Sequence, residues 1–98
     1  MSDTIAAIAT PEGLGGIAII RISGPDAERV LNDCFRPAAP RRRFPVGRLL
    51  YGQAMDKEEP LDEAMAVLMP GPASYTREDV AEIHCHGSQA VVFRIDRK

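Results

Sequence analysis

The stretch Pro11–Gly24, P-E-G-L-G-G-I-A-I-I-R-I-S-G, joins a glycine-rich loop to a hydrophobic run that carries one arginine, Arg21. Because side chains alternate along an extended strand, one face would carry Ile17, Ile19, Arg21 and Ser23, and the other Ala18, Ile20 and Ile22. Both faces are apolar enough to be covered. A guanidinium keeps its charge, so Arg21 is expected to meet a carboxylate, a phosphate or a ring face. The simpler alternative is that Arg21 reaches water from the strand end or pairs within the fold.

The glycines of Pro11–Gly16 do not fit a loop that binds nucleotide phosphates. In such loops a strand leads into the glycines and a helix follows, whereas here a strand follows and no G-x-x-x-x-G-K-[ST] motif is present. Since Thr4–Thr10 is also a short strand candidate, Pro11–Gly16 is predicted to be the loop of a β-hairpin.

The composition is that of one small domain spanning residues 1–98, with a net charge of -2 and a pI near 5.6. A core of this size is marginal, so help from a partner surface is expected. The acidic balance argues against direct nucleic-acid binding, and the basic run Arg41–Arg43 is interpreted as a solvated linker. The N-terminus lacks the features of a leader and no stretch approaches the roughly 20 apolar residues of a membrane span, so a cytoplasmic location is expected.

The remaining elements follow from periodicity. A helix is predicted to start at Ser23–Pro25 and to end before Pro37, with an apolar stripe formed by Ala27, Val30, Leu31, Cys34 and Phe35. Strands are predicted at Phe44–Gly52, Glu63–Met69 and Val80–His86, with a polar turn at Asp56–Pro60, and a last helix is predicted from Gly87 with the stripe Val91, Val92 and Ile95. Cys34 and Cys85 fall on apolar faces, which favours small buried side chains over a disulfide or a metal knuckle.

The order β-β-α-β-β-β-α is typical of an α+β domain with helices on one face of a mixed or antiparallel sheet. On the strand Val80–His86, Glu82, His84 and His86 share one face. Three interpretations are open: a solvated polar face, a small-molecule pocket, or a zinc or iron site. The metal site requires side chains about 7 Å apart to converge.

Two segments, T-I-A-A-I-A-T-P-E-G-L-G-G-I-A-I-I-R-I-S-G and M-P-G-P-A-S-Y-T-R-E-D-V-A-E-I-H-C-H-G, resemble the N-terminal domain of the MnmE (TrmE) tRNA-modification GTPases. The resemblance runs from Thr4 to Gly87. It implies a β2-α-β3-α folate-binding-type domain, completed by exchange of N-terminal strands in a homodimer. It also implies that a tetrahydrofolate derivative, 5-formyl- or methylene-tetrahydrofolate, binds at the dimer interface.

The family's folate contacts correspond to Arg21 and Glu82 in this sequence. A pterin carries amide and amino N–H groups that can donate two hydrogen bonds to a carboxylate. The folate tail carries carboxylates or a ring face that a guanidinium can bind. A third family contact, a lysine, would lie beyond Lys98. On physical grounds alone, Tyr75 as a stacking surface and His86 as a donor are further candidates, and a structural role explains each equally well.

The chain departs from the family at His86-Gly87-Ser88, where the family has H-G-G, and in a short, polar end. It is expected to be an N-terminal domain incomplete at its C-terminal end, without the G domain and without catalytic residues of its own. The resemblance also implies that full-length relatives use GTP, Mg and K, and act with the flavoprotein MnmG on tRNA. The leading hypothesis is a folate-binding and dimerisation module, and the alternative is a structural dimerisation domain that binds no ligand.

Overall fold

The computed structural model describes residues 4–8, 17–39, 44–71 and 78–86. In these residues six strands form one sheet in the order β1-β2-β6-β5-β4-β3, and every pair of neighbouring strands is antiparallel. The elements are β1 (Ile5–Ile8), β2 (Ile17–Ser23), α1 (Ala27–Cys34), β3 (Phe35–Pro37), β4 (Leu50–Asp56), β5 (Glu59–Met69) and β6 (Val80–His86). Of the two sheet types predicted, the antiparallel one is therefore observed.

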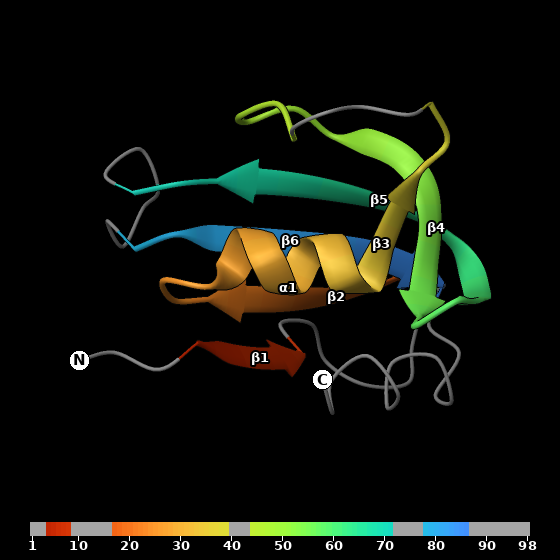
Figure 1. The fold of residues 1–98 in the computed structure, drawn as a ribbon, viewed down its shortest axis with the longest axis horizontal. Coiled ribbons are helices and arrows are strands. Elements are labelled where there is room, and N and C mark those ends of the chain that lie inside the picture. Colours follow the sequence, from red (N-terminus) through yellow and green to blue (C-terminus); the bar gives the residue numbers. More distant parts are fainter. Residues whose placement is uncertain (1–3, 9–16, 40–43, 72–77, 87–98) are drawn as a thin grey trace.

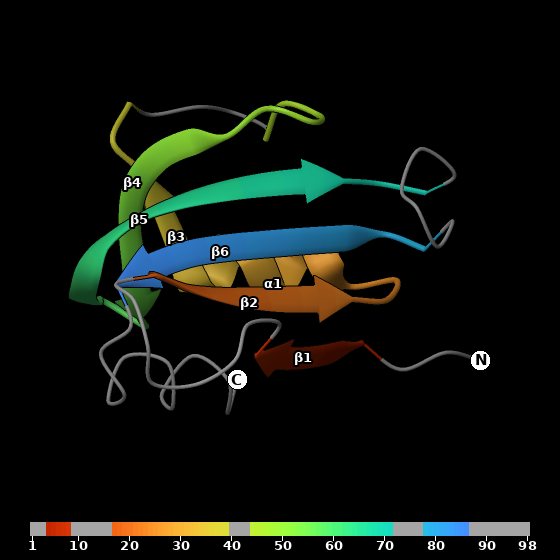
Figure 2. The ribbon, with the colours of Figure 1, turned by 180° about the vertical axis from the view of Figure 1, so that it is seen from behind.

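The helix α1 lies across one face of this sheet, in front of β2 and β6 in Figure 1 and behind them in Figure 2. Its buried residues are Ala27, Leu31 and Cys34, which are one turn or two turns apart on the predicted stripe. In the part of the chain that the structure describes, no helix has the length and apolar character to cross a membrane.

The core lies between α1 and the covered face of the sheet. The strand side chains that fill it alternate along β2 and β6, as the period-two pattern predicts. They include Ala18, Ile20, Ile22, Ala81, Ile83 and Cys85, together with Ala64, Ala66 and Leu68 from β5. Cys34 and Cys85 are both buried thiols, as expected. The opposite face of the sheet therefore carries Arg21 and its neighbours.

The hairpin prediction is confirmed at the level of strand pairing, because β1 pairs antiparallel with β2 from Ile5 opposite Ser23 to Ile8 opposite Ile20. The loop that joins them, residues 9–16, lies outside the described residues, as does the predicted last helix from Gly87.

The predicted start of α1 is wrong in its capping. Ser23 ends β2, and its hydroxyl binds the Glu78 carboxylate instead of an amide of the helix. The helix begins after Asp26, whose side chain makes no capping hydrogen bond. The Asp26 amide instead donates to the Thr4 hydroxyl at 2.9 Å. This hydrogen bond connects the start of the helix to the residue that precedes β1.

The prediction that Phe35 belongs to the helical stripe is also wrong. Phe35 has extended dihedral angles and begins β3, opposite Ala54 of β4. Its ring packs against Phe44 with the centroids 5.8 Å apart. The Phe35 side chain is buried, as predicted for the apolar stripe, but its backbone pairs with β4. A buried apolar side chain is therefore compatible with either a helix or a strand at this position.

The strand predicted at Phe44–Gly52 is displaced toward the C-terminus. Pro45 cannot donate to a ladder, and Gly47 has a φ of +68°, so the chain enters β4 only at Leu50. The turn predicted at Asp56–Pro60 is present but short, with Lys57 at a φ of +59°, and β5 already begins at Glu59. The strand predicted at Glu63–Met69 is the inner part of β5, and Val80–His86 is confirmed as β6.

Candidate functional site

The candidate site is built by the register of β2 and β6, two central strands that come from opposite ends of the chain. Arg21 stands directly opposite Glu82 in this antiparallel pair, so both side chains leave the same face of the sheet. Arg21 donates to a single carboxylate oxygen, Glu82 Oε2, from Nη2 at 2.7 Å and from Nε at 3.0 Å. Glu82 is therefore the carboxylate partner expected for Arg21. The two residues are far apart in the sequence and meet because β2 pairs with β6.

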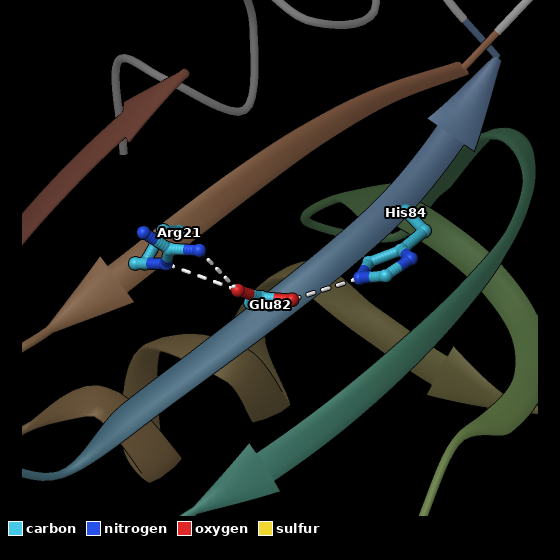
Figure 3. Close-up of polar contacts among 3 residues, drawn as sticks. All are labelled: Arg21, Glu82 and His84. Carbon is cyan, nitrogen blue, oxygen red and sulfur yellow. Dashed lines mark hydrogen bonds and ion pairs between the residues drawn. The ribbon is translucent and has the colours of Figure 1, made fainter. Parts of the chain in front are cut away.

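His84 completes this cluster from the same strand as Glu82. Its Nε2 lies 2.9 Å from Glu82 Oε1, the oxygen that Arg21 does not use. An ionised carboxylate only accepts hydrogen bonds, so the imidazole nitrogen must be the donor. Figure 3 shows the three side chains in a row, with the carboxylate between the guanidinium and the imidazole.

The three side chains differ in their access to water. Glu82 is only 14 % exposed, while His84 is 29 % and Arg21 is 52 % exposed. A carboxylate at this depth needs donors to remain ionised. Burial is the largest single influence on Glu82 and would raise its pKa, but the hydrogen bonds from His84 and Arg21, with their charges, outweigh it and hold the pKa below its ordinary value. The site therefore presents a negative, partly buried acceptor beside an accessible positive donor.

Of the other two candidate residues, the structure describes only His86, which has a different partner. His86 lies two residues further along β6, and its Nδ1 is 3.0 Å from Asp62 Oδ2. Tyr75 lies outside the described residues. His84, in contrast, was not predicted as a binding residue and was noted only because it shares a strand face with Glu82 and His86. The sequence signal for its contact with Glu82 is the i, i+2 spacing on that face.

The metal interpretation of Glu82, His84 and His86 finds no support in the geometry. His84 is hydrogen-bonded to Glu82, whereas His86 is hydrogen-bonded to Asp62. Within residues 4–8, 17–39, 44–71 and 78–86, no group of three or more His, Cys, Asp or Glu side chains is arranged to hold a metal ion.

The sheet face around the cluster is only partly covered, contrary to the expectation that both faces of β2 would be covered. Val67 and Val80 on this face are buried, but several large apolar side chains are exposed. These are Ile5, Ile17, Tyr51 and Met65, which the strand register assigns to the same face as Arg21. Exposed apolar groups around a charged cluster are typical of a surface that meets a ligand or a partner.

A groove of about 610 Å³ opens elsewhere, where the C-terminal half of α1, β3 and the β4–β5 turn meet. Its walls include Arg29, Asp33, Arg36, Lys57 and Glu58, so it has mixed charge. None of the three cluster residues lines it. The Arg21–Glu82–His84 cluster is thus an open surface site on the sheet, and a ligand held there would need a further surface to enclose it.

Comparison with known proteins identifies relatives over nearly the whole chain. The family model described as "GTP-binding protein TrmE N-terminus" matches residues 4–98. The chain is 55 % identical over 91 residues to the "tRNA modification GTPase MnmE" of Nitratidesulfovibrio vulgaris (strain DP4), a match that covers 92 % of this chain and 20 % of that protein. The protein of the same name from Chloroflexus aurantiacus is 54 % identical over 88 residues, covering 89 % of this chain and 19 % of the relative.

A third relative of the same name, from Geobacter sulfurreducens, is 50 % identical over 97 residues, covering 97 % of this chain and 21 % of the relative. The chain thus spans about a fifth of the length of the curated relatives that it matches. Together with the family match over residues 4–98, these identities show that the chain belongs to the TrmE N-terminal family, the N-terminal region of the tRNA modification GTPases named MnmE.

Proposed function

We propose that this chain is a module that binds a reduced folate, a one-carbon donor, and that forms a homodimer within a tRNA-modification GTPase. The observation that carries the proposal is the Arg21–Glu82–His84 cluster, where a partly buried carboxylate and an accessible guanidinium stand side by side on an incompletely covered sheet face.

The chemistry of the cluster suits the pterin end of a folate. The pterin ring carries neighbouring N–H donors, which an ionised carboxylate accepts, and Glu82 is held in the ionised form. Arg21 is hydrogen-bonded to the same carboxylate and has half of its side chain in water, so its remaining donors or its planar face can meet the pterin carbonyl or ring of the same ligand. A tetrahydrofolate derivative such as 5-formyl- or methylene-tetrahydrofolate offers both the N–H donors and the carbonyl acceptor at its pterin end.

The same face supports the proposal of a homodimer. The cluster is open, and a ligand that lies on it would be enclosed only by another surface. Among the described residues, β1 has a hydrogen-bonded neighbour on one side only, and a strand edge of this kind is a template for pairing with another chain. A second copy of this chain that pairs with this edge would cover the exposed Ile5 of β1.

A structural dimerisation domain without a ligand is the second candidate. The observation that favours it is the exposed apolar group of Ile5, Ile17, Tyr51 and Met65, which a dimer would bury whether or not folate binds. In this alternative the Arg21–Glu82 pair has only a structural role on the sheet face.

Two measurements on the same protein separate these candidates. Sedimentation reports the dimer, and the thermal midpoint with and without 5-formyltetrahydrofolate reports the ligand, because binding to the folded state alone raises the midpoint. The proposal predicts a dimer whose midpoint rises with the folate and no longer rises in Arg21→Ala. The matched control is Arg29→Ala, since Arg29 is an exposed arginine of α1 with its own ion pairs to Asp26 and Asp33. A dimer whose midpoint no reduced folate changes would favour the structural candidate.

The activity of the whole protein extends this proposal. The relatives are named tRNA modification GTPases. We propose that the whole protein acts on tRNA together with the flavoprotein MnmG and uses GTP with Mg and K, and that this module contributes the one-carbon donor and the contact between the two copies.

A further inference from the structure

We infer that His84 is a positioning residue of this site: its Nε2–H holds Oε1 of Glu82, which fixes the orientation in which the carboxylate meets a ligand's N–H donors. The inference rests on the proposed function in one respect, namely that Glu82 accepts hydrogen bonds from the ligand. It concerns a residue for which neither the family match nor the names of the relatives provide a role.

The first argument is the division of the carboxylate between its two partners. Both donors of Arg21 converge on Oε2, at 2.7 and 3.0 Å, instead of spanning both oxygens. Oε1 is left to His84 at 2.9 Å. Without His84 the carboxylate could turn so that Arg21 takes both oxygens in the bidentate arrangement that guanidinium and carboxylate prefer. With His84 bound to Oε1 and Arg21 to Oε2, the orientation of the carboxylate is fixed, and with it the direction of the one acceptor lone pair that Oε1 retains.

The second argument is the surroundings of Glu82 on its neighbouring strands. On β2 its register partner is Arg21, and on β5 its register partner is Val67, a buried apolar residue. The donor to Oε1 therefore comes from β6 itself. Among the described residues, that donor is His84. Burial would raise the Glu82 pKa, and the hydrogen bonds from His84 and Arg21 both lower it.

The third argument is that His84 is itself held in place. The register places it between Ile19 of β2 and Met65 of β5, and its side chain is only 29 % exposed. A ring packed between apolar neighbours loses little further freedom when it orients a carboxylate, which is how supporting residues preorganise a site.

His86 provides a matched control on the same strand face. It has the same side chain two residues further on, but it is 63 % exposed and its hydrogen-bond partner is Asp62. A substitution there removes a histidine from the face without touching Glu82.

The test uses His84→Leu and His84→Met, which keep bulk but donate no hydrogen bond, His84→Gln, whose amide N–H can replace the donor, and His86→Leu as the control. Two readouts are taken on each protein: the titration of the Glu82 carboxyl carbon by NMR and the Kd for 5-formyltetrahydrofolate by calorimetry. We expect the two non-donating variants to raise the Glu82 pKa and to weaken binding by about ten-fold, the amount for loss of a hydrogen bond to a charged group. His84→Gln should restore most of both, and His86→Leu should leave the Glu82 pKa unchanged. Arg29→Ala, on α1 with its own ion pairs, should change neither.

The outcomes distinguish the inference from the proposed function. If the unsubstituted protein binds folate and His84→Leu and His84→Met bind it equally well, the positioning role is overturned while the folate site stands. Equal losses in His84→Gln and His84→Leu would also overturn it, because packing of the ring, and not its donor, would then be responsible. If the unsubstituted protein binds no folate but the Glu82 titration responds to His84 as expected, the folate proposal fails and the positioning of Glu82 is supported.

Discussion

The Arg21–Glu82 pair should stabilise the fold by a measurable coupling energy, which a double-mutant cycle with Arg21→Met and Glu82→Gln isolates. The guanidinium is 52 % exposed, which limits the energy toward the 0–1 kcal/mol typical of surface pairs. The carboxylate is 14 % exposed and receives two N–H donors, which raises the energy toward that of hydrogen bonds to charged groups. We therefore expect a coupling of about 1 kcal/mol at low ionic strength, reduced by added salt.

Urea unfolding followed by circular dichroism, on the parent and the three variants, gives this coupling from four free energies of unfolding. The pH dependence has a definite sign because the folded pKa of Glu82 is lowered. The stabilisation should be complete above the ordinary carboxyl pKa and should be lost as the pH falls through the lower folded pKa. A coupling at neutral pH indistinguishable from zero, or one that grows on acidification, would refute the reasoning.

Three further predictions concern other parts of the sheet. In Gly52→Ala the new Cβ would stand 2.1 Å from the carbonyl oxygen of Arg36, so β3 and β4 must separate; calorimetry should show a loss of about 1–3 kcal/mol, and an unchanged Tm would contradict the close approach. Burial raises the pKa of the Cys85 thiol to about 11, so at pH 8 it should react with a disulfide reagent far more slowly than a free thiol, and an equal rate would contradict its burial. The hydrogen bond to Glu63 raises the pKa of Tyr51, so Glu63→Ala, which removes the acceptor, should lower that pKa in an ultraviolet difference titration, and an unchanged pKa would show that the bond is absent.

The parts of the fold with strong local patterns were predictable from the sequence. Strict alternation in Val80–His86 and the apolar stripe of Ala27, Leu31 and Cys34 identified β6 and α1. The strand pattern also placed Arg21 on a largely apolar face of one strand and Glu82 on a polar face of another, and the family resemblance joined the two as candidate folate contacts.

The register between strands could not be predicted from these patterns. That Arg21 faces Glu82 directly depends on how β2 pairs with β6, a contact between residues 61 positions apart. The same holds for Phe35, whose apolar side chain fits either a helix stripe or a strand, and whose state was decided by the partner strand β4. His84 was grouped with His86 because the spacing was equal, whereas the structure separates them by their carboxylate partners.

Calorimetric titration of 5-formyltetrahydrofolate into the protein, compared with its Arg21→Ala and Arg29→Ala variants, tests the central claim most directly. The account predicts saturable, micromolar-range binding that weakens by about ten-fold or more in Arg21→Ala, as expected for loss of a charged hydrogen-bonding group of the site, and that is unchanged in Arg29→Ala. Identical heats for the parent and Arg21→Ala would contradict the role of the Arg21–Glu82 site in holding the folate.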